Sequence, residues 1–145
     1  SKPGEEWTFL GFSYRKGIID VCRVSVDKLK GKMRRKARAL NRWAGRKKVA
    51  GEKAAAVFIK RFNEKLYDNP KDNELTWSRW FFPVINTDVS LKEIDAYMQE
   101  CIRYLATGKR TNAKYKFTYD DMKRIGYISM VNEYYKWNKE DSSNM

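Results

Sequence analysis

The residues of this chain that could do chemistry are mostly cations, and they are concentrated in one segment. Twelve of its 31 Lys and Arg residues lie between Arg23 and Lys48, where the only acid is Asp27, so this segment holds +11 of the net charge of +13. Residues 1–22 have three basic and three acidic residues, and residues 49–145 have sixteen and fourteen. Arg binds phosphates through bidentate hydrogen bonds, and Lys acts as a mobile point charge. Such a concentration of charge indicates a partner with dense negative charge.

Several common catalytic sites cannot be assembled from this sequence. The chain has no His, which removes the commonest general base and with it the Ser-His-Asp and Cys-His systems. It has neither a P-loop nor a GxGxxG motif. Cys22 and Cys101 lie far apart in apolar patterns, which predicts buried free thiols rather than a disulfide or a zinc site. We therefore expect no catalytic residue, no metal ligand and no cofactor in this chain.

The bulk composition is that of one folded domain. Of the 145 residues, 42% are hydrophobic, and the 21 Trp, Tyr and Phe residues are enough to build a core. No apolar run approaches the roughly 20 residues that cross a bilayer, and no signal peptide is visible. We therefore expect a cytoplasmic protein with no membrane partner.

Two predicted strands precede the basic segment. Residues 7–14 are rich in aromatic and hydroxyl residues, as strands are, and residues 18–24 are expected to form a second strand. The turn between them has Gly17 to supply a positive φ, so the sequence predicts a β-hairpin. Gly11 inside the first strand indicates either a bulge or a close approach to a ligand. Because a lone hairpin is too small to be stable, we expect it to complete a sheet in an upstream part of a longer protein.

The basic segment itself predicts a long helix with two faces. We expect Ser25 to cap it and Asp27 to lie in its first turn. Steps of three and four define an apolar stripe that docks on the domain: Val26, Leu29, Met33, Ala37, Leu40, and Trp43 or Ala44. Cations occupy the remaining circumference: Lys28, Lys30, Lys32, Arg34, Arg35, Lys36, Arg38 and Arg42. Like charges at these spacings destabilise a helix by a few tenths of a kcal/mol per pair. Either a partner neutralises them or they form a solvated basic face.

Helical patterns continue to the end of the chain. They predict a basic loop at 45–51 and two longer helices at 54–66 and 90–108, with an aromatic segment at 75–85 between them. The second of these helices should begin with a capping box from Ser90 to Glu93. Two short helices are predicted at 118–125 and 129–137, capped by Thr118 and Ser129. The expected core residues of the two longer helices are Ala55, Phe58, Ile59, Phe62, Leu66, Leu91, Ile94, Met98, Ile102 and Leu105. Trp77 and Trp80 either fill the core or stack on bases.

These elements together predict a mainly α fold. We expect an N-terminal β-hairpin in residues 1–24, a bundle of about five helices in residues 25–137, and a flexible tail in residues 138–145.

The order of the elements resembles the palm-to-thumb junction of bacterial reverse transcriptases. Phe9-Leu10-Gly11-Phe12, a Gly turn, a second strand and a Ser-capped basic helix are similar to the last palm block and first thumb helix of group II intron reverse transcriptase–maturases. Residues 75–85, 94–110 and 125–136 are similar to C-terminal parts of such enzymes.

The resemblance implies that Phe9–Phe12 supports the primer strand, with Gly11 allowing close approach, and that the basic helix lies along the template–primer duplex. Together with the basic loops at 45–51 and 109–116, the second of which could equally be a solvated connector, this gives the expected nucleic-acid-binding residues: Phe9, Leu10, Gly11, Phe12, Lys28, Lys32, Arg34, Arg35, Arg38, Arg42, Arg46, Lys47, Lys48, Lys109 and Arg110. The implied partners are RNA or an RNA–DNA duplex, and the palm and fingers of the same protein. The paired Asp residues that would bind Mg²⁺ belong to a palm motif that this sequence lacks.

Two alternatives stay open. The chain could be a stand-alone basic helical domain that binds RNA or DNA, or a protein-interaction module for an acidic partner.

Overall fold

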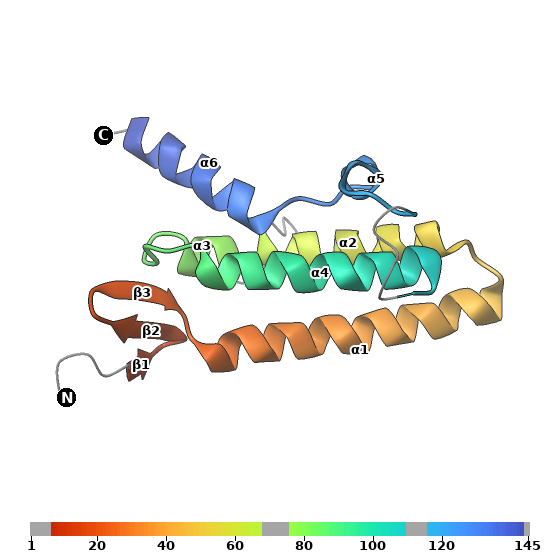
Figure 1. Cartoon of the computed structure of the whole chain (residues 1–145), viewed down its shortest axis with the longest axis horizontal. Helices are drawn as coiled ribbons and strands as arrows, with labels where there is room; N and C mark the ends of the chain where they lie inside the picture. Colours follow the sequence, from red (N-terminus) through yellow and green to blue (C-terminus); the bar gives the residue numbers. More distant parts are fainter. Residues whose placement is uncertain (1–6, 68–75, 110–115, 144–145) are drawn as a thin grey trace.

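The computed structural model describes residues 7–67, 76–109 and 116–143. These fold as three short strands followed by six helices, which confirms the mainly α class (Figure 1). The elements are β1 (Trp7–Phe9), β2 (Phe12–Arg15), β3 (Ile18–Val21), α1 (Arg23–Lys47), α2 (Gly51–Leu66), α3 (Trp77–Phe81), α4 (Val89–Thr107), α5 (Tyr119–Arg124) and α6 (Met130–Ser143).

The N-terminal sheet has three antiparallel strands, β1-β2-β3, where the sequence predicted two. The expected first strand is interrupted at Leu10 and Gly11, whose φ angles of 54° and 89° make a tight turn that sets Phe9 opposite Phe12. The second turn has the predicted positive φ at Gly17. A three-stranded sheet that packs on a helix can be stable without further strands. The reason for expecting an upstream sheet therefore no longer holds.

α3 holds the first turn in place. Phe12 is buried, and its ring centroid lies 5.0 Å from that of Phe81 and 6.2 Å from that of Trp80. The indole Nε1 of Trp80 donates a hydrogen bond of 3.2 Å to the carbonyl of Leu10. Trp80 is nevertheless 39% exposed. It covers the turn from the surface and does not fill the core.

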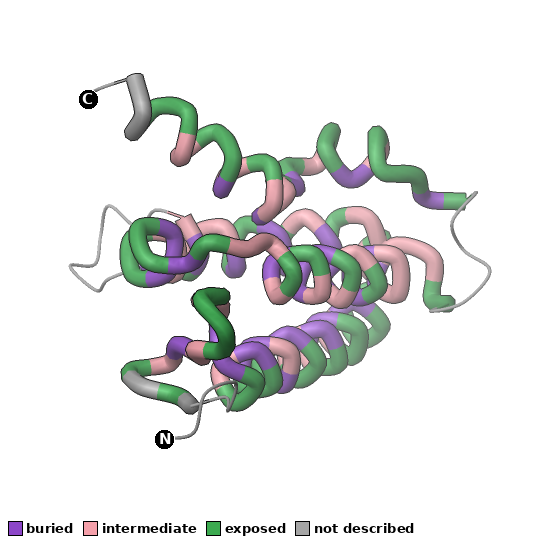
Figure 2. The backbone as a smooth tube through the Cα atoms, turned by 60° about the vertical axis from the view of Figure 1, so that its left-hand side comes forward, coloured by how far each residue is buried: buried purple, intermediate pink, exposed green. Residues whose placement is uncertain are grey.

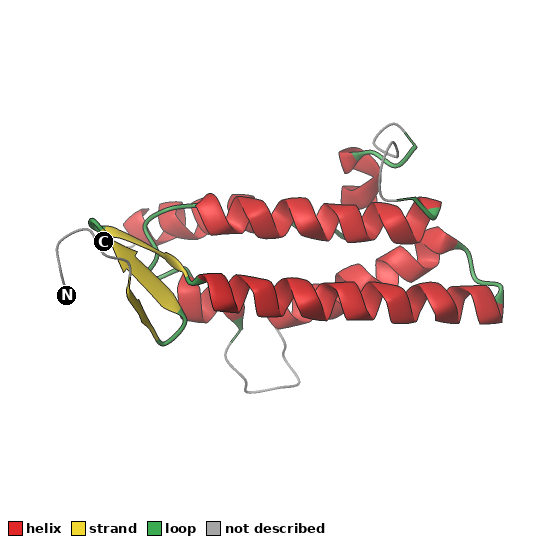
Figure 3. Ribbon diagram, turned by 60° about the horizontal axis from the view of Figure 1, so that its bottom comes forward, coloured by secondary structure: helices red, strands yellow, loops and turns green. Residues whose placement is uncertain are grey.

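The three long helices α1, α2 and α4 lie side by side and form the body of the domain (Figures 1 and 3). The predicted stripe of α1 is buried at Val26, Leu29, Met33, Ala37, Leu40 and Ala44, while Trp43 is half-buried. Every core residue predicted for α2 and α4 is also buried. Figure 2 shows α1 buried on the side that faces the other helices and exposed on the far side. Both cysteines are free and buried, as predicted.

The boundaries of α1 differ from the prediction at both ends. The helix begins at Arg23, so Ser25 and Asp27 lie inside it, and the Ser25 hydroxyl contacts the Cys22 sulfur at 3.3 Å without capping the helix. At the other end α1 continues through Lys47, so residues 45–47 of the predicted basic loop are helical. Arg46 and Lys47 therefore extend the helix, and Lys48 ends it in a left-handed conformation.

The capping predictions for the later helices were right in part. α4 begins at Val89 without the predicted capping box, because the Ser90 hydroxyl donates to Asp20 of β3 at 2.8 Å. Thr118 does cap α5, in a capping box with Asp121. The Ser129 hydroxyl accepts from the Asn132 N–H at 3.2 Å, as a cap does, and α6 runs to Ser143, beyond its predicted end. Residues 68–75, between α2 and α3, lie outside the described residues.

A buried carboxylate of α4 fixes the start of α6. Asp95 accepts hydrogen bonds from the hydroxyls of Tyr127 and Ser129, both at 2.9 Å. It also accepts from the backbone N–H groups of Met130 and Val131, at 2.7 and 3.0 Å. These N–H groups have no partner inside the helix, and the helix dipole favours an anion there. This contact was not predicted from the sequence.

Replacing Asp95 with Ala should lower the free energy of unfolding by roughly 3–5 kcal/mol, because two backbone N–H groups and two hydroxyls lose their acceptor. Urea denaturation followed by circular dichroism measures the loss. Ser129→Ala, which removes one of the four donors, should cost about 1 kcal/mol. Equal losses in the two variants would contradict this role of Asp95.

Candidate nucleic-acid interface

The exposed face of α1 carries a row of cations opposite the buried stripe. We call Lys28, Arg35, Arg38, Arg42 and Arg46 the outer row; all five side chains are exposed. They follow one another at steps of three, four or seven residues, so they share one side of the helix. At 1.5 Å per residue the row is about 27 Å long. The predicted site residues Lys32 and Arg34 are also exposed and flank it.

The acids that pair with cations of α1 lie on the flank that faces α4. The guanidinium of Arg23 bonds to Asp27 at 2.8 Å and pairs with Glu93 of α4. The ammonium of Lys30 lies 3.0 Å from the same Glu93 carboxylate. The hydrogen bonds from Arg23 and Lys30 lower the pKa of Glu93 to about 2. These contacts relieve part of the like-charge repulsion among the cations of α1.

The outer row has no such relief. Among residues 7–67, 76–109 and 116–143, none of its side chains forms an ion pair or a hydrogen bond to another side chain. α1 is therefore electrostatically two-sided, with paired cations on the flank toward α4 and unpaired cations on the face toward solvent. Unpaired cations on a rigid surface can bind an anion without first losing an internal partner.

The four residues of the predicted primer-supporting motif do different things. Leu10 is 62% exposed at the tip of the turn, whereas Phe12 is buried and supports the turn from below. A Cβ at Gly11 would lie 3.2 Å from the Ser25 hydroxyl, and only a glycine adopts its φ easily. The positive φ and the close contact with Ser25 are therefore enough to explain a glycine at position 11. The side chain of Phe9 lies outside the described part of the chain.

Four predicted cations lie at the opposite end of the bundle: Arg46, Lys47, Lys48 and Lys109, all exposed. The ends of α1 and α4 share this end of the bundle (Figure 1). α2, which follows α1, begins directly against the end of α4, where a Cβ on Gly51 would lie 2.4 Å from the carbonyl of Leu105. The turn at Leu10 lies at the other end of the bundle. The outer row therefore runs from the end that carries this turn to the end that carries the four cations. Arg110 lies outside the described residues.

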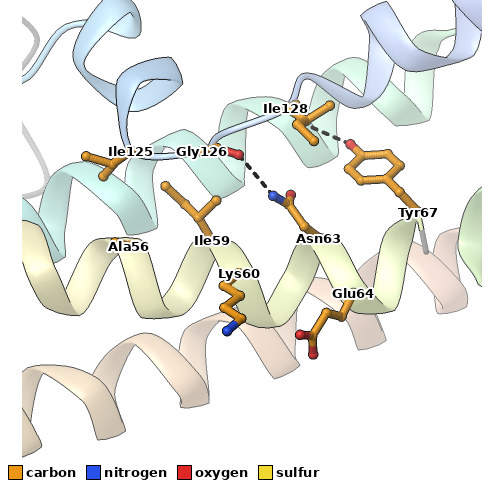
Figure 4. A pocket seen from close by; sticks show the side chains of 9 residues that line it. All are labelled: Ala56, Ile59, Lys60, Asn63, Glu64, Tyr67, Ile125, Gly126 and Ile128. Atoms are coloured by element: carbon orange, nitrogen blue, oxygen red, sulfur yellow. Dashed lines mark hydrogen bonds between the residues drawn. The ribbon is translucent and has the colours of Figure 1, made fainter. Parts of the chain in front are cut away.

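A cavity of about 390 Å³ lies between α2 and the connection from α5 to α6 (Figure 4). The Asn63 amide donates to the carbonyl of Gly126 at 2.9 Å, and the Tyr67 hydroxyl donates to that of Ile128 at 3.0 Å. Burial raises the pKa of Tyr67, so its hydroxyl remains a donor. The side chains of Lys60 and Glu64 point away from these contacts. The walls are otherwise mostly aliphatic, and α5 and α6 lie on the side of the bundle away from α1 (Figure 1).

The described part of the chain contains no group of three or more Cys, Asp and Glu side chains that could hold a metal ion. None of its helices is both long enough and apolar enough to span a bilayer.

Comparison of the chain with models of known protein families, with curated proteins and with solved structures finds no match. The functional interpretation therefore depends on the residues of the chain itself and on their geometry.

Replacing Glu93 with Gln should destabilise the domain at neutral pH and reduce its sensitivity to acid. The ordinary pKa of Glu93 is 4.5 and its pKa in the folded protein is about 2, so its stabilisation is present above the higher value and is lost as the pH falls toward the lower one. The carboxylate is about a third exposed, so we expect a loss of about 1 kcal/mol at neutral pH. Urea denaturation of both proteins at several pH values measures it. A difference that stays constant as the pH falls would contradict the assignment.

Proposed function

We propose that this domain holds a nucleic-acid duplex by its phosphates, as the thumb or maturase-type region of an RNA-directed DNA polymerase. The observation that carries the proposal is the outer row, which is unpaired, exposed and mounted on a rigid helix. The duplex would be an RNA–DNA template–primer or a structured intron RNA.

The geometry of α1 suits contact with phosphates better than readout of bases. The buried stripe packs α1 against α2 and α4, so the positions of the outer cations are fixed relative to one another. Duplexes with an A-like form have a deep, narrow major groove, and proteins hold them through phosphates and 2′-hydroxyls. A polymerase must hold many sequences alike, and phosphate contacts carry no sequence information. A row about 27 Å long can reach several phosphates at once.

The hairpin supports the same proposal at one end of the row. The Leu10–Gly11 turn packs beside Ser25 in the first turn of α1, and Ser25, Lys28 and Lys32 follow at steps of three and four. The exposed Leu10 side chain is therefore available to a ligand that lies along the start of α1. The polymerase class depends on the resemblance of Phe9–Phe12 and α1 to reverse transcriptases, and any Mg²⁺ would be bound by Asp residues of a palm.

Removing three cations from α1 tests the binding surface. For the wild-type domain and a short RNA–DNA hybrid, we expect log K to fall with log salt with a slope steeper than about −4, as for six to eight phosphate contacts. The variant Lys28→Ala, Lys32→Ala, Arg35→Ala should bind all sequences about equally weakly, with a slope reduced by about 2–3. Fluorescence anisotropy between about 50 and 200 mM salt measures both quantities.

The matched control is Lys53→Ala, Lys60→Ala, Arg61→Ala, which removes the same charge from exposed positions of α2. It should keep most of the affinity. A wild-type slope near zero, or equal losses in the two triple variants, would contradict the proposal. Equal affinity for an acidic peptide and for the duplex would favour an acidic protein partner instead. The polymerase class is tested separately by examining the coding sequence upstream of Trp7 for paired Asp residues.

A further inference from the structure

α1 contains two glycines on the side of the outer row: Gly31, which is buried, and Gly45, which is exposed. A glycine inside a helix costs about 1 kcal/mol of stability relative to Ala, because the unfolded chain has more freedom there. Gly45 lies in the last turns of α1, whereas Gly31 lies well inside the helix. A glycine at that position therefore needs a reason.

The other described glycines have reasons within the fold. Four adopt a positive φ, and a fifth packs directly on a carbonyl of α4: Gly11, Gly17, Gly108 and Gly126, then Gly51. Gly31 has neither property. Outside the helix backbone, the three atoms nearest to a Cβ at Gly31 all belong to the tip of the Arg35 side chain, with Nη1 at 3.2 Å. A flexible side chain can move by that much, so the fold does not require a glycine here.

The position of Gly31 connects it to the outer row. It lies three residues after Lys28 and four residues before Arg35, so it occupies the one place in the row that has no side chain. The helix backbone at Gly31 is nevertheless buried, because the Arg35 guanidinium lies across it. The one acid within α1 is Asp27, four residues before Gly31, and Arg23 binds its carboxylate.

We infer that Gly31 forms a notch in the outer row that seats one phosphodiester of the duplex, between the ammonium of Lys28 and the guanidinium of Arg35. The inference rests on the proposed function and adds the position on α1 to which the duplex comes closest. In the free domain Arg35 covers the notch. In the complex Arg35 turns toward the phosphate and binds it bidentately, and the backbone at Gly31 is then free for close contact. A side chain at position 31 would keep the phosphate farther from both cations, and the attraction falls with distance.

The test is Gly31→Ala, with Gly45→Ala as its matched control on the same helix. Gly31→Ala should weaken binding of a short RNA–DNA hybrid about fivefold, the size of one impaired charge-assisted hydrogen bond. The bulkier Gly31→Leu should weaken it further. Gly45→Ala should change the affinity less than about twofold, since it lies about 21 Å along the helix. Both Ala variants should melt at the wild-type temperature or above it, because Ala favours the helix.

A second measurement separates a notch from a general effect on α1. In an Arg35→Ala background, Gly31→Ala should cost less than in the wild type, because both changes weaken contact with the same phosphate. Additive losses, equal losses for Gly31→Ala and Gly45→Ala, or a lowered melting temperature for Gly31→Ala would each overturn the notch. If wild type binds the hybrid with a steep salt dependence and Gly31→Ala binds equally well, the notch fails and the proposed function stands. If wild type does not bind the hybrid, both fail.

Discussion

The packing of α1 on α2 and α4 is the interaction on which the rest of the structure depends. A single stripe of six buried residues, from Val26 to Ala44, joins this helix to both neighbours. The stripe has to supply enough apolar burial to offset the repulsion among the cations of the same helix. Because it occupies only one side, it also decides which cations face solvent and keeps them in a fixed order.

The acids near α1 pair with its cations on only one side of the helix. Glu93 of α4 neutralises the flank that carries Arg23 and Lys30, and Asp27 assists at the same place. The outer row, on the far side, has no acid from the described part of the chain. Pairing on the flank strengthens the attachment of α1 to α4, while the unpaired face keeps a strong positive potential for a partner. One helix thus serves both the fold and the proposed interface.

Periodicity was enough to predict the features that depend on one element alone. The buried stripe of α1, the core residues of α2 and α4, and the Thr118 cap follow from spacing and residue type. Features that depend on residues distant in sequence were missed. Asp95 of α4 fixes the start of α6. Glu93 was expected to cap its own helix, but it pairs with Lys30 of α1. The turn at Leu10 was missed because a leucine rarely adopts a positive φ.

Mapping where a duplex touches the domain tests most directly whether the exposed face of α1 is its binding surface. An amide NMR titration of the domain with a short RNA–DNA hybrid gives that map residue by residue. We expect the largest shifts along the exposed face of α1, from Lys28 to Arg46, with little change around Asn63 and the cavity beside it. Shifts centred on α5, α6 or that cavity, with α1 unchanged, would contradict it.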